Sequence, residues 1–139
     1  MAWDFISISA QADAADGNIT LNAPANASQG DLLVACIGYR DSAAFTAPVG
    51  AGWNLVATQQ TSGDVDATSG IASGGMWYVV RGADNPSFVF TRTAGSAAVG
   101  VVLCYRNVNP TSPYDTGNAA TLGSIGEPAL GTFNTAEAN

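Results

Sequence analysis

The feature that most constrains the fold of this chain is a series of short apolar runs bounded by turn-forming residues. The stretch SQGDLLVACIGYR (residues 28–40) begins with a turn and continues as an apolar run, and AAVGVVLCYRNV (residues 97–108) repeats this design. Runs of this length suit strands, and no segment has a sustained period of 3.6 residues. We therefore expect strands at residues 3–9, 18–22, 31–39, 53–60, 75–81, 87–91, 98–106 and 125–133.

About eight short strands separated by Gly, Pro, Asn and Asp predict an all-β fold, an antiparallel β-sandwich that is jelly-roll-like. The order of strands does not distinguish a plain sandwich from a jelly roll. Residues 10–17 (AQADAADG) are expected to form a loop, because Asp13, Asp16 and Gly17 favour a turn. The chain has 139 residues, 47% of them hydrophobic, and no break in composition, so a single domain is expected over residues 1–139.

Charge argues against nucleic acid and membrane as partners. Eleven acidic residues face four basic ones, giving a formal net charge of −7, and the arginines are spread over separate strand ends. The segment MAWDFISISA has no positively charged start and contains Asp4, so no export signal is expected. The longest apolar run, residues 97–105, is about half as long as a membrane helix. The chain is therefore predicted to be soluble.

The side chains needed for several kinds of catalysis are missing from the sequence. Without histidine there is no Ser-His-Asp or Cys-His pair, and without lysine there is no Schiff base. Paired carboxylates can hydrolyse glycosides, but here the acids lie mostly in predicted turns. These acids are Asp13, Asp16, Asp41, Asp84 and Asp115. No catalytic residue, cofactor or metal site is predicted, and the protein is not expected to be an enzyme.

The two cysteines, Cys36 and Cys104, share strand parity with apolar neighbours. They are expected to be free, buried thiols, with a structural disulfide as the alternative. Arg40 and Arg106 follow the two cysteine-containing strands and are interpreted first as residues that end the strands and second as interface residues. Exposed pairs with Asp41 or Asp115 would stabilise the fold little.

A candidate ligand loop lies at residues 61–75, where Asp64 and Asp66 have a spacing found in oxygen-rich calcium sites. The alternative is a solvated acidic loop. Trp77 follows the loop and completes the candidate site, although aromatic residues on strands more often fill a sandwich core. Trp77 and Tyr78 have opposite parity, so one is expected to face inward and the other outward. A glycan is the ligand class that such exposed aromatic residues would suit.

The N-terminal segment is the candidate partner-binding region. Trp3, Phe5 and Ile6 make residues 1–9 an apolar arm or anchoring strand that would dock on a partner subunit.

A series of motifs in order resembles a recurrent β-sandwich module of phage virion proteins and bacterial surface proteins. The segments are GDLLVACIGYR, PVGAGWNLV, GGMWYVVRGADNPSFVFTRT and AAVGVVLCYRNVNPTSPYD, within residues 18–133. The matching residues are Gly30, Asp31, Leu32, Leu33, Pro48, Gly52, Trp53, Trp77, Tyr78, Pro86, Tyr105, Arg106, Val108, Pro110, Pro113 and Asp115. In such modules another strand commonly follows the last segment, so we expect that strand from residues 3–9, from a neighbouring subunit, or from a longer polypeptide.

The resemblance implies a structural or adhesive role and supplies no catalytic residues. The expected function is that of a capsid decoration or cement protein of a tailed phage, binding the major capsid protein or another virion subunit in many copies. Its expected location is the virion surface, after assembly in the host cytoplasm. The alternatives are a tail-fibre or surface adhesin module that binds host glycans, and an extracellular carbohydrate-binding domain.

Overall fold

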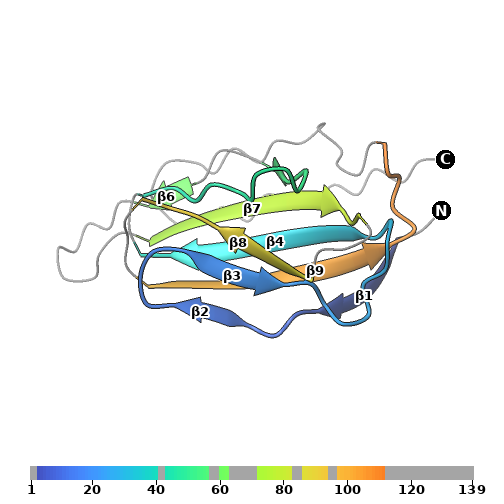
Figure 1. The fold of residues 1–139 in the computed structure, drawn as a ribbon, viewed down its shortest axis with the longest axis horizontal. Helices are drawn as coiled ribbons and strands as arrows, with labels where there is room; N and C mark the ends of the chain where they lie inside the picture. The colour runs from blue at the N-terminus through green and yellow to red at the C-terminus, as the bar shows by residue number, and fades with distance from the viewer. Residues whose placement is uncertain are drawn as a thin grey trace.

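The computed structural model describes residues 3–40, 43–56, 60–62, 72–82, 86–93 and 97–111. Within these ranges the chain is all-β (Figure 1). The strands are β1 (Asp4–Ile8), β2 (Ala12–Ala14), β3 (Ile19–Asn22), β4 (Leu32–Tyr39), β5 (Asn54–Leu55), β6 (Gln60–Ser62), β7 (Ala72–Val80), β8 (Ser87–Phe90) and β9 (Ala98–Arg106). No helix long and apolar enough to cross a membrane occurs in these ranges.

The strands form two antiparallel sheets. The main sheet has the order β1-β9-β4-β7-β5, with β2 also pairing with β9 and β6 with β7. One edge of this sheet is formed by β1 and β2 and the other by β5 and β6. The second sheet is the ribbon of β3 and β8, which crosses one face of the main sheet (Figure 1). The predicted antiparallel sandwich is confirmed.

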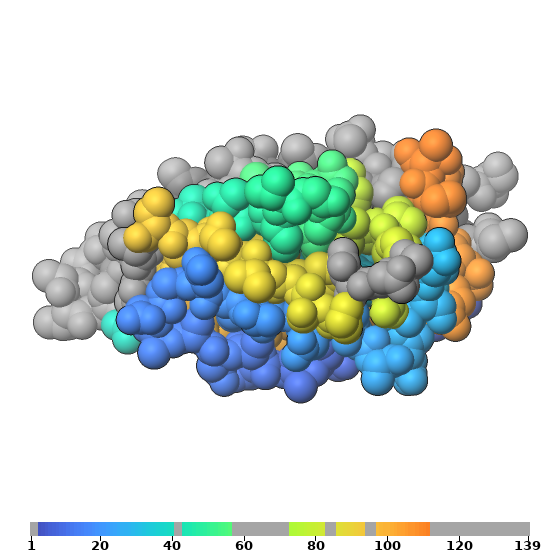
Figure 2. All heavy atoms as spheres, in the orientation of Figure 1, coloured from blue at the N-terminus to red at the C-terminus, as the bar shows by residue number. Residues whose placement is uncertain are grey.

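The chain between β4 and β5 extends the smaller layer. The N–H of Thr46 donates to the carbonyl of Thr91 at 2.7 Å, and the N–H of Thr91 donates back at 2.9 Å. In the space-filling view this green segment lies beside β8, and together they cover the face of the main sheet toward the viewer (Figure 2).

The core lies between the ribbon and the main sheet, because alternate residues of each strand point to opposite faces. The buried core side chains of the main sheet include Leu33, Ala35, Ile37, Trp77, Val79, Val102 and Cys104, and those of the ribbon are Ile19, Leu21, Phe88 and Phe90. Gly100 lets the ribbon approach closely, since a Cβ there would lie 2.8 Å from Cδ2 of Leu21.

The sequence located most strands to within a few residues. Within the predicted strand at residues 53–60, Asn54–Leu55 and Gln60 pair with β7, and residues 57–59 lie outside the described residues. The loop predicted at residues 10–17 was wrong. This segment contains β2, whose Ala12 and Ala14 pack toward the core while the strand pairs with β9. The strand predicted at residues 125–133 lies outside the described residues.

Candidate functional site

An exposed aromatic cluster lies at the β1 edge of the main sheet. The side chains of Trp3 and Phe5 are 69% and 57% exposed, and both rings meet the half-buried ring of Tyr105 on β9 edge-on. The ring centroids are 5.8 Å and 5.6 Å from that of Tyr105. Ile8 is also exposed and pairs with Leu103 of the same strand. We call Trp3, Phe5, Ile8 and Tyr105 the aromatic edge.

The backbone of β1 explains why these side chains stay outside. Phe5 pairs with Tyr105, so its side chain lies on the face of the sheet opposite the core. The register shifts between Phe5 and Ser7, which is the mark of a β-bulge. Ile6, at this shift, is half-buried and packs against the core. Of the three predicted contact residues, the structure therefore brings Trp3 and Phe5 together and separates Ile6 from them.

The N-terminal segment is a strand of the main sheet. The backbone continues its pairing past β1, because the N–H of Ser9 donates to the carbonyl of Val102 at 2.8 Å. The side-chain oxygen of Ser9 accepts a 2.9 Å hydrogen bond from the N–H of Val102. Of the two predicted forms, the described residues 3–9 adopt the strand, because their backbone groups gain partners along β9.

An acid–arginine clamp lies next to the aromatic edge. Asp31 is 3% exposed, and Arg106 donates to both of its carboxylate oxygens at 2.8 Å, from Nε and Nη2. The N–H of Ser28 donates to Oδ2 of Asp31 at 2.7 Å. The hydrogen bonds from Arg106 are the largest cause that lowers the pKa of Asp31. This clamp fastens the turn before β4 to the end of β9.

Sequence reasoning missed the pairing of Arg106 with Asp31. The predicted partners, Asp41 and Asp115, lie outside the described residues. The antiparallel register pairs Leu32 with Tyr105, which places Asp31 opposite Arg106. The sequence does contain a signal, because Asp31 lies just before one strand and Arg106 ends another. The pairing could be predicted only once the register of the two strands was known.

The two cysteines lie on opposite faces of the main sheet. Leu33 pairs with Cys104 and Cys36 pairs with Val101, so the thiols cannot meet. Both are free, as predicted, but Cys36 is only half-buried. Burial is the main cause that raises the pKa of Cys104 to about 11, and burial also raises the pKa of Cys36. Neither thiol is activated for nucleophilic chemistry.

The predicted ligand loop does not extend to Trp77. This side chain is 2% exposed, and its ring packs 5.1 Å from that of Phe90 in the core. The parity of β7 points Trp77 toward the ribbon and leaves the half-buried Tyr78 on the other face, as the alternation predicted. Asp64 and Asp66 lie outside the described residues. Among the described residues no cluster of three or more potential metal ligands occurs.

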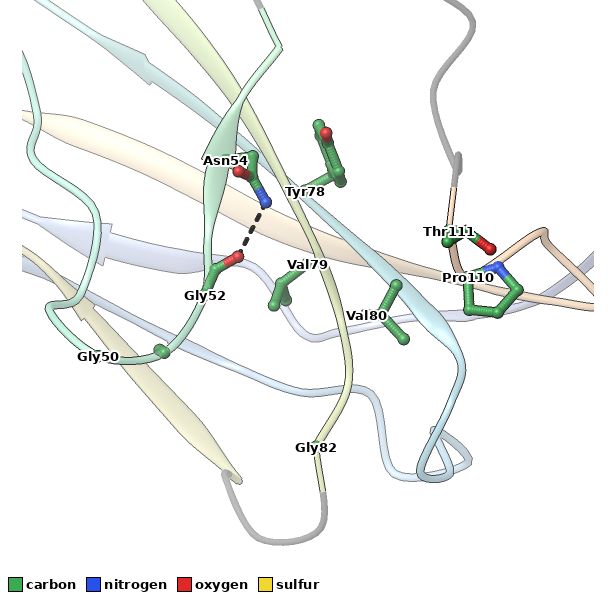
Figure 3. Close-up of a pocket in the computed structure, with 10 residues that line it drawn as sticks. Gly50, Gly52, Asn54, Tyr78, Val79, Val80, Gly82, Pro110 and Thr111 are labelled. Carbon is green, nitrogen blue, oxygen red and sulfur yellow. Dashed lines mark hydrogen bonds between the residues drawn. The ribbon is translucent and has the colours of Figure 1, made fainter.

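A groove of about 500 Å³ lies at the opposite edge of the main sheet from the aromatic edge (Figure 3). Its wall on the β5 side is a turn with positive φ at Gly50 and Gly52, and Nδ2 of Asn54 donates to the Gly52 carbonyl at 2.9 Å. The lining residues are Gly50, Ala51, Gly52, Asn54, Tyr78, Val79, Val80, Gly82, Pro110 and Thr111. None of them is charged. Figure 3 places Pro110 and Thr111 across β7 from the glycine turn.

Comparison with protein-family models, with curated proteins and with solved structures gives no match to this chain. The resemblance to virion and surface modules therefore stays a prediction from sequence motifs. Any function must be argued from the aromatic edge, the clamp and the groove.

Proposed function

We propose that this protein is a non-enzymatic structural virion protein that decorates the capsid of a tailed phage through its aromatic edge. The observation that carries the proposal is the exposure of Phe5 on β1, a strand of the main sheet, and of Trp3 just before it. Large aromatic side chains that remain exposed on a folded body are typical anchors of protein interfaces. The expected partner is the major capsid protein or another virion subunit.

The surroundings of the aromatic edge favour a rigid contact. The ring of Tyr105 supports both Trp3 and Phe5, and the clamp from Arg106 to Asp31 fixes the end of β9 beside them. A preorganised surface loses little conformational entropy on binding, so a small patch is effective. The net charge of −7 disfavours binding to DNA.

The first test is the position and copy number of the chain in purified particles. We expect electron microscopy and quantitative mass spectrometry to find many copies on the head. A few copies confined to the tail, together with glycan binding, would support a tail-fibre adhesin and contradict the proposal.

The second test separates binding from folding. The double variant Trp3→Ser, Phe5→Ser is expected to keep its circular dichroism spectrum and lose attachment to particles that lack the protein. Its matched control is Val89→Ser, which changes an exposed apolar residue on β8 in the other layer. Attachment of the double variant at wild-type level would refute the proposal. Deletion of residues 1–9 is a poorer test, because it removes an edge strand of the main sheet.

A further inference from the structure

We propose that the groove at the β5 edge binds a short extended peptide of a partner protein, which adds as a strand beside Val80. This inference does not depend on the proposed function, since it concerns the other edge of the main sheet. It rests on the direction of the backbone groups of β7, on the shape of the groove, and on the uncharged residues that line it.

The hydrogen-bond ladder fixes where the N–H and C=O of Val80 point. The N–H of Arg81 donates to the carbonyl of Asp31 at 2.8 Å on the β4 side. The carbonyl of Met76 accepts from the N–H of Val56 at 2.9 Å on the β5 side. Because backbone groups of successive residues point to opposite edges, Val80 shares the direction of Met76 and points away from β4.

No described strand pairs with Val80 on that side. β5 covers β7 only at two positions, where Asn54 pairs with Tyr78 and Leu55 with Trp77. The positive φ of 73° at Gly52 turns the chain away before it reaches Val80. A donor and an acceptor at ladder spacing thus face the groove beyond the end of β5, and unpaired strand edges of this kind accept additional strands.

The groove has room for a strand at this place. Val80 and Gly82 belong to its lining, and a Cβ built on Gly82 has no neighbour within 4 Å. A volume of about 500 Å³ lies within the range of sites that enclose small ligands. Figure 3 places Thr111 on the far side of β7 from Gly50, with Val80 between them. A strand added on the β5 side of Val80 would therefore run beside the glycine turn, with Thr111 on the other side of β7.

The lining chemistry selects a neutral peptide. None of the described residues that line the groove is charged, so an ionic ligand would lose hydration without gaining a partner among them. The backbone of an extended peptide supplies an acceptor for the Val80 N–H and a donor for its carbonyl at matching spacing. The side chains of Tyr78 and Val80 lie on one face of the sheet, where alternate apolar side chains of the peptide would pack.

The test uses the full chain and a blocked peptide of alternating threonine and valine, about six residues long. At millimolar peptide we expect a chemical-shift change at the Val80 amide in a nitrogen-15 NMR spectrum and slower hydrogen exchange of its N–H. The same peptide methylated at every backbone nitrogen cannot donate and is expected to leave Val80 unchanged. An unmoved Val80 amide, or equal binding of the methylated peptide, would overturn the proposal. Displacement of the peptide by a neutral oligosaccharide would also overturn it, in favour of a sugar site.

Two variants locate the site without disturbing the ladder. Gly82→Leu fills open space and is expected to weaken peptide binding about tenfold. Thr93→Leu, an exposed position outside the groove, is its control and should bind as the wild type does. Val80→Pro removes only the outward N–H and should also abolish the shift, whereas Val80→Ala keeps it. If thermal unfolding shows that Val80→Pro does not fold, the result for Gly82→Leu decides the test. Peptide binding by Gly82→Leu as tight as that of the wild type would refute the proposal.

Discussion

The two faces of the main sheet carry similar apolar residues and meet different surroundings. On β7, Trp77 is 2% exposed, whereas its neighbour Met76 is 45% exposed. On β9, Val102 is fully buried, whereas Val99 is 42% exposed. The covered face lies under the ribbon of β3 and β8, so burial here follows from packing of the second layer. Residue type alone does not separate the two faces.

The covered face carries the stability, and the other face and its edges carry the surfaces available for contact. Both the aromatic edge and the Tyr78 side of the groove belong to the face opposite the ribbon. Substitutions on the covered face should therefore change unfolding, and substitutions on the other face should change it little.

The largest effect on stability is expected on β8, where the adjacent residues Phe90 and Val89 differ in exposure. Phe90→Ala removes a ring that is 0% exposed and leaves a cavity, so we expect a loss of about 3–5 kcal/mol in the free energy of unfolding. Val89→Ala, one position earlier and 44% exposed, should lose less than about 1 kcal/mol. Urea unfolding followed by tryptophan fluorescence measures both. Equal losses would mean that the ribbon does not form the core.

This alternation is the part of the fold that the sequence predicted well. Residues 98–106 were predicted as a strand with the bounds that the structure has, because their apolar pattern is long and ends at Arg106. The strand β2 was missed, since nothing local in Ala12–Ala14 favours a strand and its pairing with β9 is a tertiary contact.

The candidate sites were predicted less completely. Trp3 and Phe5 were identified because aromatic residues near a chain end are conspicuous. Trp77 was assigned to the ligand loop as well, but its position on β7 points its side chain toward the ribbon and into the core. The groove had no sequence signal, because its walls come from β5, β7 and the segment after β9, which only the fold brings together. Its open backbone edge depends on where β5 stops.

The second prediction compares two carboxylates. Asp31→Asn replaces a buried acid held by Arg106 and should lose about 2 kcal/mol of unfolding free energy at neutral pH. Asp13→Asn, at an exposed position on β2, is the control and should lose little. Urea unfolding of both variants measures the difference. A loss for Asp13→Asn as large as for Asp31→Asn would contradict the role given to the clamp.

The same clamp predicts a pH dependence. The folded-state pKa of Asp31 is lowered, so its stabilising effect is fully present above the unfolded pKa of about 3.9 and is lost as pH falls through the folded value. The gap in stability between wild type and Asp31→Asn should therefore close on acidification below about pH 4. A gap that stays constant down to about pH 2 would show that the carboxylate charge does not matter.

The third prediction compares two glycines of the main sheet. Gly100→Ala would place a Cβ 2.8 Å from Cδ2 of Leu21 on the covered face, which should destabilise by about 1–2 kcal/mol. Gly38→Ala, on the other face, meets only Cγ1 of Val99 at 3.9 Å and should be neutral or slightly stabilising. Thermal unfolding measures both. A neutral Gly100→Ala would mean that the ribbon moves away at little cost.

The smallest effect concerns thiol labelling, which compares the two faces by the reactivity of their cysteines. In a Cys104→Ala variant, Cys36 should react slowly with a disulfide reagent in the folded protein, because it is half-buried and burial raises its pKa. In a Cys36→Ala variant, Cys104 is 0% exposed with a pKa of about 11, so it should react only as fast as the sheet opens. Low urea should then accelerate Cys104 far more than Cys36. Similar rates and similar urea dependence for the two thiols would contradict this comparison. They would mean that the ribbon protects Cys104 no better than the uncovered face of the sheet protects Cys36.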